Sequence, residues 1–95
     1  AYLKALADHL PAVFDFRPDL VLYQAGVDPL AEDRLGRLAL TLDGLARRDR
    51  LVLTECRSRG IPVSLGLGGG YADPIELSVQ AYANTYAVAR DVYRF

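Results

Sequence analysis

Apolar and polar residues follow helical spacing in three segments of the chain and form short apolar runs in two others. Through residues 1–15 apolar positions recur every three or four residues, which predicts a first helix. Pro11 within it favours a kink or an early end. Residues 20–24 are a short apolar run that predicts a buried strand. Residues 25–40 have no clean period and predict a loop, with or without a turn of helix.

The middle of the chain predicts a second helix followed by a second strand. Thr41 can cap a helix that runs to about Arg59, and we expect the charged residues 47–50 to lie toward solvent. Gly60 supplies a left-handed stop for this helix. The apolar run over residues 61–67 then predicts the second strand.

The last helix has the strongest start signals in the sequence. We expect Asp73 as its N-cap, with Pro74 in the first turn and Glu76 completing a capping box. Apolar residues follow at a spacing close to the helical period. The expected apolar face consists of Ile75, Val79, Tyr82, Tyr86, Ala89 and Tyr93.

The element order α-β-α-β-α predicts an α/β fold with a parallel sheet and right-handed crossovers. Both predicted strands are almost wholly apolar, which is typical of strands covered on both faces. Two strands make a poor sheet by themselves, so we expect neighbouring strands from a longer chain or from a second copy. Unpaired strand edges and uncovered apolar faces also predict self-association.

Composition narrows the classes of partner. The 95 residues make one domain at most, and eleven basic residues nearly cancel twelve acidic ones. This balance argues against direct binding of nucleic acid. No apolar run approaches the roughly 18 residues of a membrane span, and no signal-peptide pattern is present. The single cysteine, Cys56, excludes an internal disulfide and fits a cytoplasmic location.

Each predicted strand is followed by glycine and then by a residue whose side chain could bind a ligand or take part in catalysis. Asp28 follows the first strand and Gly26, and Tyr71 follows the second strand and three glycines. Ligands of open parallel sheets bind at this carboxyl edge. Asp28 is either a loop-capping residue or a hard oxygen ligand for a metal such as zinc. Tyr71 is either a packing residue or a hydrogen-bond donor to a developing oxyanion.

Three other features have weaker chemical interpretations. The glycine loop before Tyr71 lacks both the dinucleotide fingerprint and the Lys-Ser/Thr of a P-loop, which argues against a phosphate cradle. We expect His9 to be a surface residue. Cys56 is expected as a packing or surface residue, although Arg57 and Arg59 nearby could lower its pKa.

Several motifs occur together in an order and spacing that resemble the histone deacetylase superfamily. They are Gln24-Ala-Gly26-Val-Asp28, Asp33-Arg34-Leu35-Gly36, Leu40-Thr41, Gly60-Ile-Pro62 and Gly68-Gly-Gly-Tyr71. The sequence is most similar to bacterial members related to class IV deacetylases and acetoin-utilisation proteins. The resemblance implies that residues 1–95 are the C-terminal segment of an arginase/deacetylase-type three-layer α/β/α fold.

The resemblance also implies a zinc site held by two aspartates and one histidine, and a substrate that is acetyl-lysine or a related acyl amide. Asp28 matches the later zinc-binding aspartate, and Tyr71 matches the tyrosine that polarises the carbonyl. Gly69 and Gly70 match glycines along the acyl-lysine channel. The family's His-His pair and Asp-x-His segment are absent from this sequence. We therefore expect this chain alone to be inactive, and His9 does not replace either motif by its spacing.

Two other functions remain open at this stage. The first is a non-catalytic, oligomerising α/β interaction module that completes its sheet with a second copy. The second is a flavodoxin-like domain that would bind its ligand at the loop of residues 68–70.

Overall fold

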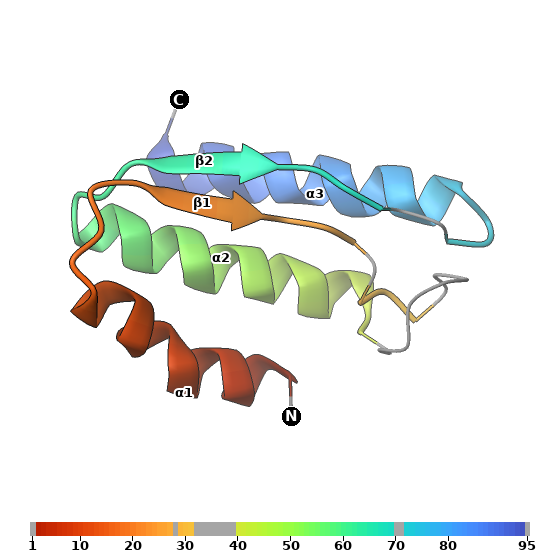
Figure 1. Ribbon diagram of the computed structural model, residues 1–95. Helices are drawn as coiled ribbons and strands as arrows, with labels where there is room; N and C mark the ends of the chain where they lie inside the picture. The colour runs from red at the N-terminus through yellow and green to blue at the C-terminus, as the bar shows by residue number, and fades with distance from the viewer. Residues whose placement is uncertain (1, 28, 32–39, 70–71, 95) are drawn as a thin grey trace.

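Two parallel strands lie side by side over two helices, and a third helix packs against one of these (Figure 1). The computed structural model describes residues 2–27, 29–31, 40–69 and 72–94. The order of helices and strands along the chain confirms the predicted α/β fold. The elements are α1 (Tyr2–Asp15), β1 (Val21–Gln24), α2 (Leu42–Ser58), β2 (Val63–Gly66) and α3 (Glu76–Tyr93).

The sheet is parallel, so both strands point their carboxyl ends toward the same edge. Its register places Val21 opposite Val63 and Gln24 opposite Gly66. One more bond extends the pairing beyond β1, where Ala25 N–H donates to the Gly66 carbonyl at 2.8 Å. The loops that follow the two strands therefore start side by side.

One face of the sheet packs on the helices and the other is open. Val63 and Leu65 of β2 contact a buried cluster that contains Leu53 of α2 and Val88 of α3. The side chain of Leu22, which points to the opposite face, is 76% exposed. The prediction that both strands are buried on both faces is therefore wrong for these residues, because α2 and α3 both cover the same face.

The start and stop signals of α2 are confirmed. The Thr41 hydroxyl accepts a hydrogen bond from Gly44 N–H at 2.9 Å, as an N-cap does. Gly60, just past the helix, has a φ of 67°, a left-handed conformation that costs glycine little. The expectation that residues 47–50 lie toward solvent is wrong for Arg48 and Asp49, which are 4% and 0% exposed.

The predicted start of α3 is wrong by about two residues. Ile75 is the N-cap and makes no side-chain capping bond, so the capping box of Asp73 and Glu76 does not form. The backbone instead turns at this point, with Leu77 N–H donating to the Pro74 carbonyl at 3.1 Å. The local signal located the helix correctly, but a turn of the backbone replaces the side-chain cap.

The buried face of α3 also differs from the expected one. Val79 is 64% exposed and Tyr86 is 48% exposed, although both were predicted to lie on the apolar face. Small and polar residues take their place, because they allow α3 to approach α2 closely and to share hydrogen bonds with it. The buried residues of α3 are Ser78, Ala81, Thr85, Val88 and Ala89.

Helix α1 lies at the outside of the molecule and packs against α2. It runs to Asp15 with Pro11 inside it, so the proline does not end the helix early. The guanidinium of Arg59 lies 4.1 Å from the centre of the Phe14 ring and links the ends of the two helices. Among the described residues, no helix combines the length and apolar character needed to cross a membrane.

Candidate functional site

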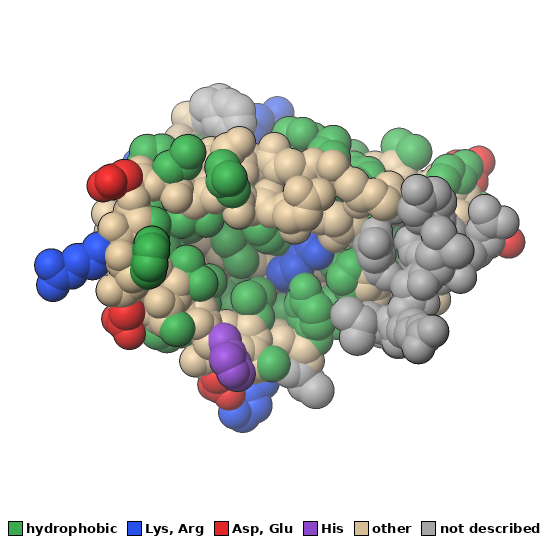
Figure 2. Space-filling view, viewed as in Figure 1, with side chains coloured by type: hydrophobic (Ala, Val, Ile, Leu, Met, Phe, Trp, Pro, Cys, Tyr) green, Lys and Arg blue, Asp and Glu red, His purple; other side chains and the backbone are tan. Residues whose placement is uncertain are grey.

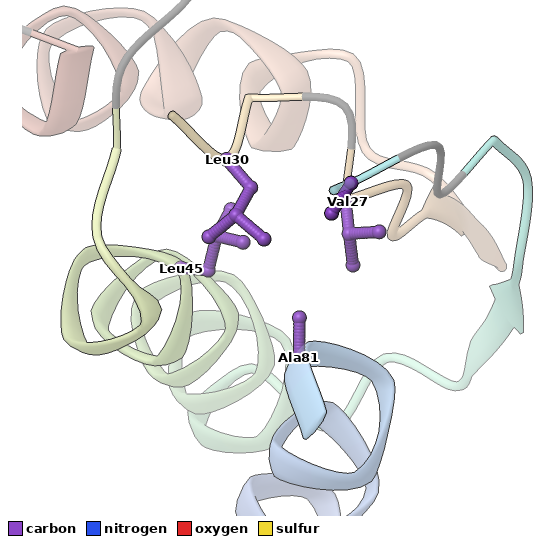
Figure 3. Packing of buried hydrophobic residues seen from close by; sticks show 5 residues of the cluster. Val27, Leu30, Leu45 and Ala81 are labelled. Atoms are coloured by element: carbon purple, nitrogen blue, oxygen red, sulfur yellow. The ribbon is translucent and has the colours of Figure 1, made fainter. Parts of the chain in front are cut away.

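Residues next to the two predicted site residues pack into one buried cluster at the carboxyl edge of the sheet. Asp28, Gly70 and Tyr71 lie outside the described residues. Val27 and Ala72, which precede Asp28 and follow Tyr71, are 0% and 5% exposed and belong to the same cluster. Figure 3 shows the packing around it; the cluster consists of Val27, Leu30, Leu45, Ala72 and Ala81. The two loops therefore share one support, built on α2 and α3.

The loop after β1 is held by main-chain and side-chain bonds. One guanidinium nitrogen of Arg48 donates to the Gly26 carbonyl at 2.6 Å. Further along, Leu30 and Leu40 form an isolated parallel bridge, in which Ala31 N–H donates to the Leu40 carbonyl at 2.9 Å. The described ends of this segment are thus fixed on both sides of Asp28.

Arg48 belongs to a buried polar network that is centred on Asp49. One carboxylate oxygen of Asp49 accepts from Arg48 Nε at 3.1 Å and from a terminal Arg48 nitrogen at 3.0 Å. The same oxygen accepts from the Tyr23 hydroxyl at 2.5 Å. The other oxygen accepts from the Thr85 hydroxyl at 2.6 Å. These bonds connect β1, α2 and α3 around a carboxylate that is wholly buried.

The network changes the electrostatics of Tyr23. Burial raises the pKa of its phenol well above the ordinary value, although the positive charge of Arg48 opposes the shift. The hydrogen bond to Asp49 raises the pKa further, since a neighbouring carboxylate disfavours a phenolate. Tyr23 therefore keeps its proton at neutral pH and donates a hydrogen bond to Asp49.

Sequence reasoning missed this network because it treated the charged stretch as a solvated surface. A signal was nevertheless present. Asp49 follows Leu45 by four residues and precedes Leu53 by four, so all three lie on one face of α2. Both leucines are buried. A carboxylate at that spacing needs partners, which come from β1 and α3 in the structure.

The loop after β2 is anchored by two side chains of α3. The Tyr82 hydroxyl accepts from Gly68 N–H at 3.2 Å and donates to the Gly68 carbonyl at 2.5 Å, with the Gly69 carbonyl 3.2 Å away. The Ser78 hydroxyl accepts from Ala72 N–H at 3.1 Å. The described residues on both sides of Gly70 and Tyr71 are thus tied to one helix.

Glycine is favoured before Tyr71 for two different reasons, of which the backbone conformation of Gly69 is the stricter, because the flexible end of Gln24 can move. Gly66 and Gly68 lie against the side-chain amide of Gln24, and a Cβ at these positions would come within 2.8 and 2.6 Å of it. Gly69 has a φ of 72°, which an L side chain rarely adopts. Of the four predicted site residues, Gly69 is the one that the structure describes, and it lies exposed at the carboxyl edge of the sheet.

The described residues do not make a complete metal site. They contain no group of three His, Cys, Asp or Glu side chains that could hold an ion. His9 is exposed on α1, as expected, and its Nδ1 lies 2.8 Å from the Ala5 carbonyl oxygen. The carboxylate of Asp28 is chemically suited to zinc, but three protein ligands are the norm for a catalytic zinc ion. The described residues by themselves therefore do not form a catalytic zinc site.

Cys56 is a buried packing residue. Burial raises the pKa of its thiol, even though Arg59 has the opposite effect. The suggestion of a lowered pKa is therefore wrong, because desolvation outweighs the nearby positive charge.

Comparison with known proteins identifies related sequences over nearly the whole chain. Residues 1–88 match the histone deacetylase domain family. An uncharacterized protein of Picosynechococcus sp. is 50% identical over 93 residues, which cover 97% of this chain and 31% of that protein. Histone deacetylase 2 of Arabidopsis thaliana is 41% identical over 71 residues, covering 74% of this chain and 18% of that protein.

Histone deacetylase B of Dictyostelium discoideum is 38% identical over 71 residues, which cover 74% of this chain and 16% of that protein. The chain thus spans about a third or less of the length of these relatives. The matched segment of 88 residues includes both strands and the two loops at their carboxyl edge. This chain belongs to the histone deacetylase family.

Proposed function

We propose that the full-length protein containing this chain is a zinc-dependent deacetylase that hydrolyses acetyl-lysine or a related acyl amide. Asp28 would supply one zinc ligand, Tyr71 the donor to the substrate carbonyl, and Gly69 and Gly70 part of the substrate channel. The observation that carries this proposal is the shared cluster of Val27 and Ala72, neighbours of Asp28 and Tyr71, at one edge of the sheet.

Each residue has a role that follows from its chemistry. A bound zinc ion would supply Lewis-acid activation of water. Asp28 would fix the ion at the end of β1, since carboxylate oxygens are suitable zinc ligands. The Tyr71 phenol would donate a hydrogen bond to the carbonyl oxygen as negative charge develops on it. Gly69 leaves room beside the reacting group because it has no Cβ.

The remaining zinc ligands and the general base would come from outside these 95 residues. The single histidine, His9, lies exposed on α1, and the described part of the chain contains no cluster that could complete a zinc site. We therefore propose that this chain is inactive by itself and corresponds to the C-terminal segment of the catalytic domain.

Two substitutions in the full-length protein separate the proposed roles. Asp28→Ala should abolish zinc retention, as measured by metal analysis after dialysis. Tyr71→Phe should keep zinc and lower kcat by about 10²–10³, because one oxyanion donor is lost. Asp43→Ala and Tyr86→Phe are matched controls, since both residues are exposed on helices. Equal zinc loss in the Asp28 and Tyr71 variants would contradict these roles.

A non-catalytic interaction module is the second candidate. It is favoured by the apolar side chains that the described structure leaves in solvent, above all Phe16 at 85% and Leu22 at 76% exposure. Such surfaces commonly mark contacts with another protein or with another copy of the same chain. Sedimentation of the isolated chain, discussed below, tests this candidate.

A further inference from the structure

We infer that Arg48 is a positioning residue for Asp28: through the Gly26 carbonyl it fixes the path of the chain into the zinc-binding loop. This inference rests on the proposed function. Arg48 is on α2, twenty residues beyond Asp28 in the sequence, and its side chain is 5% exposed. Its terminal nitrogen reaches the Gly26 carbonyl oxygen at 2.6 Å.

The bond to Gly26 begins where the sheet ends. The last main-chain bond between the strand segments joins Ala25 N–H to the Gly66 carbonyl. Gly26 follows directly, and its carbonyl is held by a charged side chain. Asp28 is two residues further along the chain. Glycine adds no side-chain constraint of its own, so the guanidinium supplies order that the loop sequence lacks.

The guanidinium is itself held rigidly. Two of its nitrogens donate to one oxygen of Asp49, at 3.1 and 3.0 Å, and the third donates to Gly26. A planar fork with these fixed donors defines direction as well as distance. Tyr23 and Thr85 orient the Asp49 carboxylate from the other two sides. Arg48 therefore connects the start of the loop to a network that joins β1, α2 and α3, so the packing of these elements determines where Gly26 lies.

A guanidinium that served only to neutralise Asp49 would not need this third bond. The carboxylate also receives the Tyr23 and Thr85 hydroxyls, so its oxygens are well supplied with donors. The remaining Arg48 donor does not bond to Asp49. It donates to the main-chain carbonyl of Gly26, at the start of the loop after β1. Groups that orient metal ligands from outside the coordination shell commonly affect metal affinity by about 10- to 100-fold.

The test compares Arg48→Met with Arg47→Met in the full-length protein. Arg47 is the matched control because it is the preceding arginine of α2 and forms an exposed ion pair with Asp43. Zinc affinity is measured by competition with a chelator, alongside kcat and the melting temperature. We expect Arg48→Met to weaken zinc binding about tenfold or more. Arg47→Met should leave zinc affinity unchanged.

Removing Arg48 leaves Asp49 buried without its cation, so two further variants protect the test against misfolding. Arg48→Lys keeps the charge, but its compact ammonium cannot reproduce the fork, and we expect intermediate zinc affinity. Arg48→Met/Asp49→Asn removes both charges and leaves an amide whose oxygen can accept from one of the Tyr23 and Thr85 hydroxyls and whose NH2 group can donate to the other. We expect this double variant to fold and to bind zinc as weakly as Arg48→Met.

The outcomes separate the inference from the proposed function. A folded double variant with the zinc affinity of the unsubstituted protein would overturn the positioning role, even if its melting temperature were lower. Asp28→Ala is measured in the same series. If Asp28→Ala loses zinc and the Arg48 variants do not, the inference fails and the proposed function stands. If Asp28→Ala retains zinc, the proposed function fails first.

Discussion

The Asp49 carboxylate lies in the interior of the molecule, where a positive charge and hydrogen-bond donors offset the cost of burying it. It pairs with Arg48 and accepts from the hydroxyls of Tyr23 and Thr85. An isolated carboxylate at such a place would be strongly unfavourable, and removal of one partner of a buried ion pair typically costs about 3–5 kcal/mol. At the scale of single residues, this network ties the interior to the candidate site.

Tyr23 makes the stability of the protein depend on pH in the alkaline range. Because its pKa is raised above the ordinary value near 10, the folded protein keeps the phenolic proton at a pH where the unfolded chain loses it. The stability contributed by this proton is fully present below about pH 10. It is lost as the pH rises toward the raised pKa, at up to about 1.4 kcal/mol per pH unit.

Tyr23→Phe should remove this dependence. At neutral pH the variant should be less stable by about 1.5–3 kcal/mol, since a hydrogen bond to a carboxylate is lost. Urea unfolding between pH 7 and about pH 11 should show this difference shrinking above about pH 10. Tyr86→Phe, at an exposed position of α3, is the control. A difference that stays constant over this range would contradict the account.

At the scale of elements, α3 connects the interior of the molecule with the loop after β2. Thr85 bonds to the network, and Tyr82 and Ser78, on preceding turns, hold Gly68 and Ala72. One helix therefore contacts both the buried carboxylate and the described residues on either side of Gly70 and Tyr71. This explains why the buried face of α3 is polar in part, where an ordinary amphipathic helix would present larger apolar residues.

Tyr82→Phe should therefore affect catalysis in the full-length protein and leave zinc in place. The variant keeps the ring but loses the hydroxyl that bonds to Gly68, so Gly68, three residues before Tyr71, is held less firmly. We expect kcat to fall on the order of 10- to 100-fold, as for small misplacements of a catalytic group. Tyr86→Phe, four residues later on the same helix, should have little effect. Zinc loss in Tyr82→Phe would assign that tyrosine to the metal site.

At the scale of the whole molecule, the fold leaves much apolar surface in solvent. Figure 2 shows hydrophobic side chains at the surface in several places on the face viewed. Leu22 is exposed on the outer face of β1, Leu20 directly before this strand and Phe16 directly after α1. Val79 and Tyr86 are exposed on α3. Among the described residues the sheet has two strands, and so small a sheet is only marginally stable by itself. These surfaces favour further association with protein.

The isolated 95-residue chain should therefore self-associate. Analytical ultracentrifugation at micromolar concentration should show species larger than a monomer, because burial of the exposed apolar residues is favourable. The double substitution Phe16→Lys/Leu22→Lys should shift the distribution toward the monomer. Gln80→Lys, which adds charge at an exposed polar site of α3, should not. A stable, well-folded monomer of the unsubstituted chain would contradict this prediction and the interaction-module candidate.

Local chemistry accounts for the features that the sequence predicted correctly. Thr41 caps α2 through a bond to a residue three positions away, and Gly60 ends the same helix by its own backbone conformation. The two short apolar runs form strands, and their order along the chain gives a parallel pair. These signals act within a few residues, so a single sequence contains them in full.

Tertiary structure alone decided which charged and polar residues are buried. Arg48 and Asp49 read as surface residues because their partners, Tyr23 and Thr85, lie 26 and 36 residues from Asp49 in the chain. The face of α3 was misjudged for the same reason, since the buried Thr85 hydroxyl donates to Asp49, which lies far away in the sequence. The sequence by itself determined the elements and the residues at the strand ends. Tertiary packing determined which buried residues hold these strand ends in place. The physical reason is that the cost of burying a charge depends on partners that only the folded chain brings together.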